Sequence, residues 1–127
     1  MTTAVFDSSA LLASLLNEPG ADAVRPVLGD SEMSSINYSE VVERGNAKGL
    51  DTSSLRARLA SYGFTVAPFT ADDAEATAAL STATQGYGLS LADRACLAFA
   101  LGRHAPVYTA DRPWSRVNVG VGVHMIR

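Results

Sequence analysis

The chain has 127 residues, of which 47% are hydrophobic and 18% are charged, and its formal net charge is −3 at pH 7. These values are typical of one folded domain with a buried core, and they exclude a disordered chain and a strongly basic nucleic-acid-binding surface. An enzyme that acts on nucleic acid is still allowed, because a cluster of carboxylates with a bound cation can account for the negative charge.

The sequence carries no signal for export or for a membrane. A single cysteine cannot form an internal disulfide, and no Cys/His cluster indicates zinc. The N-terminus lacks a basic region, and the longest apolar run, residues 10–16, is too short to span a bilayer. We therefore expect a cytoplasmic protein with one domain over residues 1–127 and with Cys96 in its core.

Strand and helix patterns alternate along the first half of the chain. Residues 3–7 (TAVFD) are predicted to form a buried strand, and leucines at helical spacing predict a helix from Ser9 to Asn17 that stops at NEPG. A helix interrupted at Pro26, a weak strand and two further helices follow. Their predicted ranges are 21–29, 32–37, 38–49 and 51–63.

The second half continues the alternation. A strand, an alanine-rich helix, a helix capped by Ser90, a strand, a short turn or helix opened by Asp111 and a last strand are predicted. The strands cover 64–69, 106–110 and 121–127, and the two helices cover 70–85 and 90–104. Because the strands are short, apolar and separated by helices, the sequence predicts an α/β fold of three layers with a central parallel sheet of about four to five strands.

Acidic residues fall at four junctions of this pattern. Asp7 ends the first strand, Asp111 directly follows the strand 106–110, and Glu40 and Asp93 lie in the predicted first turns of their helices. In an open α/β sheet, ligands bind outside the carboxyl ends of the strands, and helix starts generally share that edge. The spacing therefore favours, without establishing, a convergence of these acids.

Each acid alone also has a structural explanation, because helix N-termini favour acids through the dipole and through capping. Asn37 with Glu40 and Ser90 with Asp93 both resemble capping boxes, and Asp111 suits a turn. Convergence is harder to explain in this way, because two carboxylates about 4 Å apart repel by roughly 4 kcal/mol at an effective dielectric near 20. A cluster of acids favours a hard divalent cation such as Mg²⁺.

Four segments of the chain resemble PIN-domain proteins, and within that family the VapC-type ribonuclease toxins of toxin–antitoxin pairs. These segments are AVFDSSALLASLLNEPG, SSINYSEVVERG, LSLADRACLAFALGRHAPVYTADRPW and VHMIR, so the resemblance runs from about Thr3 to Arg127. It implies the PIN-like three-layer fold, an acidic pocket that holds Mg²⁺ or Mn²⁺, a homodimer, and a cognate antitoxin whose tail wraps the toxin and blocks the pocket. It assigns the metal-site and catalytic roles to Asp7, Glu40, Asp93 and Asp111.

The function implied is hydrolysis of RNA phosphodiesters by a metal-activated water, leaving a 5′-phosphate and a 3′-hydroxyl. Glu43, one turn after Glu40, is a candidate to orient a ligand or water, and Ser8 or Ser9 a candidate to contact Asp7 or a phosphate. Candidate RNA contacts are Arg94, Arg112 and Arg116, with Arg44 in the same neighbourhood. Many PIN domains carry a further acid where this chain has Pro113. The proline cannot ligate a metal, which speaks against a second metal ion.

Two other functions stay open. The first is a catalytically inactive PIN-like module that binds RNA or a protein; the presence of all four acids speaks against it. The second is an aspartyl-phosphate protein with Asp7 as nucleophile, which would need a lysine near the phosphate, and the only lysine is Lys48. His104 and His124 lie away from the junction acids and are expected to be structural, and Trp114 is expected to pack rather than to stack on a base.

Overall fold

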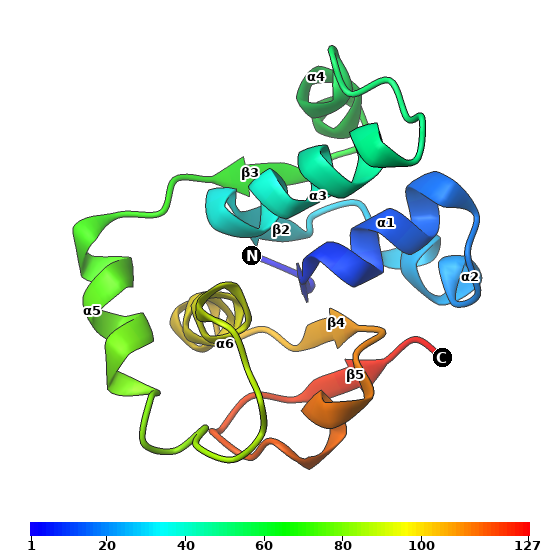
Figure 1. The fold of residues 1–127 in the computed structure, drawn as a ribbon. Coiled ribbons are helices and arrows are strands. Elements are labelled where there is room, and N and C mark those ends of the chain that lie inside the picture. The colour runs from blue at the N-terminus through cyan, green and yellow to red at the C-terminus, as the bar shows by residue number, and fades with distance from the viewer.

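Five short strands form one parallel sheet in the order β3-β2-β1-β4-β5 (Figure 1). The computed structural model describes residues 1–127. The strands are β1 (Val5–Phe6), β2 (Glu32–Ser34), β3 (Thr65–Ala67), β4 (Val107–Thr109) and β5 (Val123–Met125). The prediction of a parallel sheet is confirmed. The strand order reverses between β1 and β4, the two strands that Asp7 and Asp111 follow.

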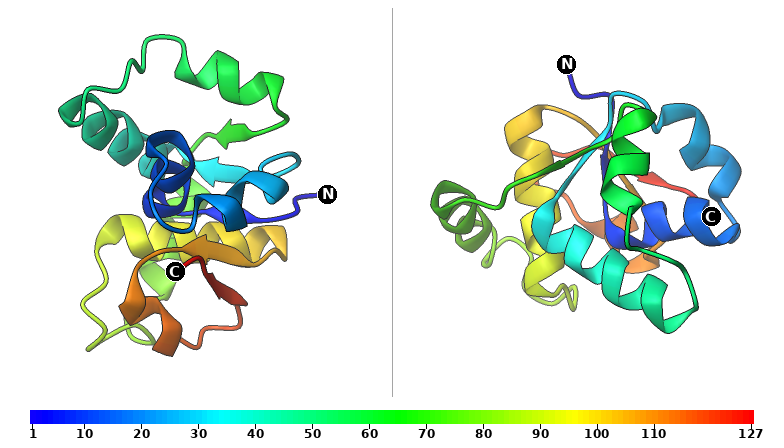
Figure 2. Two further views of the ribbon diagram at one scale, coloured as in Figure 1. Left: turned by 90° about the vertical axis from the view of Figure 1, so that its right-hand side faces the viewer. Right: turned by 90° about the horizontal axis from the view of Figure 1, so that it is seen from above.

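Helices cover both faces of the sheet, so the molecule has the three layers that the sequence predicts (Figure 2). Alternation along β1 directs Phe6 into one buried cluster with the leucines of the first helix and Val5 into another with Leu97 and Trp114. The helical elements are α1 (Ser8–Leu16), α2 (Ala21–Val24), η1 (Arg25–Val27), α3 (Ser35–Ala47), α4 (Leu55–Ser61), α5 (Ala71–Ala79), α6 (Leu91–Arg103) and η2 (Arg112–Arg116). None of these helices is long and apolar enough to cross a bilayer.

The start of α3 differs from the sequence prediction. The helix begins at Ser35 rather than Tyr38, because Ser34 ends β2 in an extended conformation and its hydroxyl accepts a hydrogen bond from the Ile36 amide at 3.3 Å. Ser34 is therefore the N-cap, and the predicted capping box of Asn37 with Glu40 is wrong. Both residues lie inside the helix, and Glu40 is in its second turn rather than its first.

Two other helices are shorter than predicted. The alanine-rich helix α5 ends at Ala79, and hydroxyl side chains in the next segment bond back to the backbone, as Thr84 does to the Leu80 carbonyl at 2.8 Å. Helix α4 begins only at Leu55, because Asp51 forms a local turn in which its carboxylate accepts from the Ser53 amide at 3.0 Å. The predicted interruption at Pro26 is confirmed, since the helix changes there from α to 3₁₀ geometry.

Candidate active site

Asp7 stands between the end of β1 and the start of α1, where donors from two parts of the chain hold its carboxylate. The Ala10 amide donates to Oδ1 at 2.9 Å, which makes Asp7 the N-cap of α1. The Ser9 hydroxyl lies 2.7 and 2.9 Å from the two carboxylate oxygens, and the Thr109 hydroxyl donates to Oδ2 at 2.5 Å. Asp7 is only 3% exposed, so these bonds fix one orientation of the carboxylate.

Burial makes the Asp7 carboxylate costly to ionise. It raises the pKa of Asp7 from 3.8 to about 6, although the hydrogen bonds from Thr109, Ser9 and the Ala10 amide act in the opposite direction. The charge of Asp111 raises the pKa further. A cation beside Asp7 would stabilise the ionised form, which is the form that ligates a metal.

Asp111 follows β4, the neighbour of β1, and its amide donates to the Thr109 hydroxyl at 3.0 Å. The side chain is exposed. Partial burial and the nearby charge of Asp93 raise the pKa of Asp111, whereas the charges of Arg44 and Arg127 lower it. Asp111 therefore interacts electrostatically with groups from three other elements of the site.

Asp93 and Glu40 reach the site from two helices. Asp93 lies in the first turn of α6, where it accepts from the Ser90 amide at 2.9 Å and completes the predicted capping box. Glu40 lies on α3, with its Oε2 atom 3.5 Å from Nη2 of Arg44. Both acids are half-buried. Each acid thus has a partner on, or next to, its own helix.

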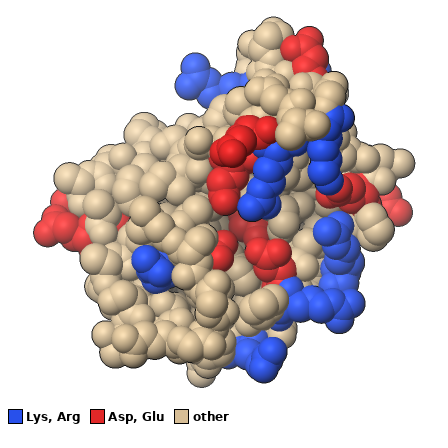
Figure 3. Space-filling model, viewed as in Figure 1, with Lys and Arg blue, Asp and Glu red and all other residues tan.

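The charges of three of the acids act on the buried thiol of Cys96 in α6. Burial raises the pKa of Cys96 well above its ordinary value, and the charges of Asp7, Asp93 and Glu40 raise it further. The charge of Asp111 also raises the pKa of Asp7, and that of Asp93 raises the pKa of Asp111, so the four predicted acids lie in one region beside the ends of β1 and β4. Figure 3 shows acidic side chains near the centre of this face, where α1, α3 and α6 come together in Figure 1, with basic side chains beside them.

This gathering is looser than a formed metal site. No three carboxylate, histidine or cysteine side chains stand close enough together to hold a metal ion. The donor set nevertheless fits a hard divalent cation, since it consists of four carboxylates whose mutual repulsion a cation would relieve.

The supporting residues lie as follows. Ser9, rather than Ser8, contacts Asp7, and its hydroxyl also accepts from the Ala110 amide at 2.9 Å. Ser8 is buried, and Glu43 is exposed one turn after Glu40. Sequence reasoning missed Thr109, and the signal available was a hydroxyl residue at the end of the strand, two positions before Asp111.

The candidate RNA-contacting arginines differ in accessibility. Arg112 and Arg116 are exposed on η2. Arg94 is half-buried and donates to the Leu89 carbonyl at 3.1 Å, so this side chain is held by the backbone rather than presented to a ligand. Arg127 was not predicted; it donates to the Pro19 carbonyl at 2.7 Å, and its charge acts on Asp111.

The structure places the tryptophan, the two histidines and the lysine as follows. Trp114 is 1% exposed and cannot stack on a base. His124 stacks on Tyr108 with ring centroids 4.3 Å apart, and His104 ends α6 in the left-handed region. Lys48 lies beyond the C-terminal end of α3, where it pairs with Glu18 at 3.1 Å. No lysine therefore accompanies Asp7, which speaks against an aspartyl-phosphate protein.

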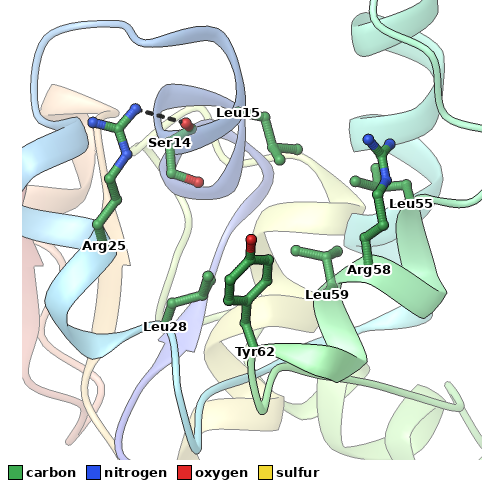
Figure 4. Close-up of a pocket in the computed structure, with 8 residues that line it drawn as sticks. All are labelled: Ser14, Leu15, Arg25, Leu28, Leu55, Arg58, Leu59 and Tyr62. Atoms are coloured by element: carbon green, nitrogen blue, oxygen red, sulfur yellow. Dashed lines mark hydrogen bonds between the residues drawn. The ribbon is translucent and has the colours of Figure 1, made fainter.

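A separate cavity of about 450 Å³ lies between α1, η1 and α4. Leucine side chains and Tyr62, which is 68% exposed, line it, while Arg25 and Arg58 stand on opposite sides (Figure 4). Arg25 is held by the Ser14 carbonyl at 3.0 Å. The lining is Ser14, Leu15, Arg25, Leu28, Leu55, Arg58, Leu59 and Tyr62, and it includes none of the four acids.

The family model of the PIN domain matches residues 4–120 of the sequence. The chain belongs to the PIN domain family. In this PIN domain, the acids at the ends of β1 and β4 and on α3 and α6 are those to which the resemblance assigned the metal site. No curated protein matches the sequence.

This PIN domain is similar to chains of solved toxin–antitoxin complexes. A chain of a toxin–antitoxin complex from Klebsiella pneumoniae is 24% identical with a TM-score of 0.72, and the match covers 98% of each chain. A chain of the DNA-bound VapBC complex from Salmonella typhimurium is 14% identical with a TM-score of 0.74, over 100% of each chain. A chain of VapBC-5 from Mycobacterium tuberculosis is 21% identical with a TM-score of 0.57, over 100% of this chain and 99% of that one. At these identities the likeness shows the fold.

Proposed function

We propose that this PIN domain is a divalent-metal-dependent endoribonuclease and the toxin of a toxin–antitoxin pair. The observation that carries the proposal is the gathering of Asp7, Glu40, Asp93 and Asp111 at the edge where the strand order reverses. The solved structures to which the chain is similar support the second part, since they are described as toxin–antitoxin complexes or VapBC.

The four carboxylates would hold Mg²⁺ or Mn²⁺, which polarises water and stabilises the negative charge that develops on a phosphodiester. The residues around them have distinct tasks. Thr109, Ser9 and the Ala10 amide keep Asp7 in one orientation. Asp111 is exposed after β4, where its carboxylate would complete the ligand set on the solvent side.

Arginines near the acids supply the positive charge that an RNA backbone requires. Arg112 and Arg116 are exposed on η2, and Arg44 and Arg127 act on Asp111 through their charges. We assign phosphate contacts to these four residues, which are all exposed, and none to Arg94, which is half-buried. RNA binding should therefore weaken steeply as the salt concentration rises.

Cleavage of cellular RNA tests the enzymatic part of the proposal. Purified protein free of antitoxin is incubated with total RNA in Mg²⁺ or Mn²⁺ and, separately, in chelator. Asp7→Asn and Asp93→Asn remove one ligand charge each, and Asp72→Asn serves as the control because Asp72 is an exposed acid on α5. Cleavage that needs metal, Asp7 and Asp93 but not Asp72 supports the proposal. A folded protein that cleaves no class of RNA would favour the inactive binding module instead.

For the antitoxin we propose the cavity between α1, η1 and α4 as the docking surface. Its leucines and Tyr62 offer an apolar floor, and Arg25 and Arg58 add positive charge on opposite sides. This combination fits an amphipathic helix that carries acidic residues beside its apolar stripe. A homodimer is expected as well, and light scattering of the purified protein tests it.

A further inference from the structure

A buried amide on α3 lies one helical turn from Glu40 and bonds to the residue that precedes Asp93. Asn37 is 1% exposed, and its Nδ2 atom donates to the Ala92 carbonyl at 3.1 Å. This bond joins α3 to the first turn of α6, across 55 residues of sequence. The other half of the amide, Oδ1, is buried and has no hydrogen-bond partner. A buried acceptor without a partner costs stability, so packing alone does not explain an asparagine here.

The position of the bond relates it to the acids on either side. Glu40 follows Asn37 by three residues, and residues at this spacing lie on one face of a helix. Ala92 directly precedes Asp93. One hydrogen bond therefore ties the face of α3 that carries Glu40 to the backbone beside Asp93.

No strand directly fixes the distance between the carboxylates of Glu40 and Asp93. Helix α3 lies in the crossover from β2 to β3, and α6 lies in the crossover from β3 to β4. The two helices pack against each other, and their relative position sets the separation of the two carboxylates. A shift of α3 along α6 would move Glu40 relative to Asp93 while leaving Asp7 and Asp111 in place.

We propose that Asn37 is a positioning residue, which sets the separation of Glu40 and Asp93 and thereby the affinity of the site for a divalent cation. The inference rests on the proposed function, because it takes the four acids as the metal ligands. Groups that orient metal ligands without touching the metal typically change affinity by about 10- to 100-fold when they are removed.

The key variant is Asn37→Leu, which keeps the branched shape of the side chain and removes both the donor and the unpartnered oxygen. The variant relieves the unpartnered oxygen but also takes a donor from the Ala92 carbonyl, so thermal unfolding is measured first to establish that it is folded. We expect Mn²⁺ to bind this variant ~10-fold or more weakly, as measured by the electron paramagnetic resonance signal of free Mn²⁺. The KM for RNA at saturating Mn²⁺ should be unchanged.

Thr77→Val is the matched control. Thr77 is also 1% exposed and donates to a backbone carbonyl, that of Asp73 at 2.7 Å, but it lies on α5 away from the acids. If Asn37→Leu fails to fold, Asn37→Thr replaces it, because the shorter threonine side chain avoids clashes with the neighbouring side chains.

The outcomes separate the inference from the function on which it rests. Weak Mn²⁺ binding by a folded Asn37 variant, with normal binding by wild type and Thr77→Val, supports the inference. Wild-type affinity in the folded variant overturns it and leaves the proposed function intact. Failure of the wild-type protein itself to bind Mn²⁺ overturns both.

Discussion

The hydroxyl of Thr109 donates a hydrogen bond of 2.5 Å to the carboxylate of Asp7, although 102 residues separate the two along the chain. Asp7 follows β1 and Thr109 ends β4, the pair of neighbours at which the strand order reverses. The same hydroxyl accepts from the Asp111 amide at 3.0 Å. Thr109 therefore links the two acids that the central strands present.

Thr109→Val should shift the pH dependence of RNA cleavage to higher pH. The Thr109 hydrogen bond lowers the pKa of Asp7, so its loss raises that pKa above its present value of about 6. A larger fraction of Asp7 is then protonated near neutral pH and unable to ligate a metal. We expect cleavage at pH 7 to fall by ~10-fold and to recover in part at higher pH. Thr84→Val is the control, because it also removes a buried hydroxyl, but one that donates to the backbone carbonyl of Leu80 and not to an acid. Identical pH profiles for wild type and Thr109→Val would contradict the role of this bond.

Asp7→Asn should stabilise the metal-free protein at neutral pH. The pKa of Asp7 rises from 3.8 to about 6 on folding, so between these values the folded protein holds a proton that the unfolded chain has lost. The free energy of unfolding therefore falls as the pH rises through this window. Above the window, the ionised and buried Asp7 lowers it by about 3 kcal/mol. With weaker hydrogen bonds in the variant, the net gain should be about 2 kcal/mol at pH 7.5 and close to zero at pH 4.

Urea unfolding in chelator at the two pH values measures this difference. Added Mg²⁺ should then raise the stability of the wild type much more than that of Asp7→Asn, because only the wild type keeps the full ligand set. A variant whose stability relative to wild type does not change between pH 4 and pH 7.5 would show that Asp7 titrates normally.

Arg58→Glu should weaken binding of the antitoxin and spare RNA cleavage. Arg58 stands beside the cavity between α1, η1 and α4, which includes none of the acids (Figure 4). Reversing its charge should repel an acidic helix and weaken the complex by ~10-fold or more. Arg56→Glu is a matched control, since Arg56 is exposed on the same helix but does not line this cavity. Titration with the cognate antitoxin measures both affinities, and equal effects of the two variants would exclude the cavity as the docking surface.

Gly20→Ala should destabilise the fold by about 2 kcal/mol or more. Gly20 has φ +99°, and a Cβ there would lie 2.7 Å from Cγ1 of Ile126 and 2.8 Å from its carbonyl oxygen. The variant combines backbone strain with a clash against the closing segment of the chain. Gly86→Ala isolates the strain, because Gly86 has φ +85° and nothing within 4 Å of the added atom. Thermal unfolding of the two variants should show the larger loss for Gly20→Ala; equal losses would mean that the contact with Ile126 relaxes freely.

Signals within a few residues of one another predicted much of the fold and part of the site. The capping box of Ser90 and Asp93 is confirmed because both partners lie in one helical turn. The equivalent prediction for Asn37 and Glu40 was wrong, because Ser34 is an equally good cap and the strand ends at it. Several cap residues in a row leave the start of a helix undetermined, and the packing of the strand before them decides it.

The sequence by itself determined that apolar runs alternate with helices and that an acid follows the first and fourth strands, since strand, helix and cap preferences act over short distances. Only the tertiary structure decided which groups meet those acids. Thr109 bonds to Asp7 because β4 lies beside β1, and Arg127 acts on Asp111 because β5 lies beside β4. Asn37 reaches Ala92 because two crossovers bring α3 against α6. Such contacts depend on the order of the strands, and no local pattern carries that order.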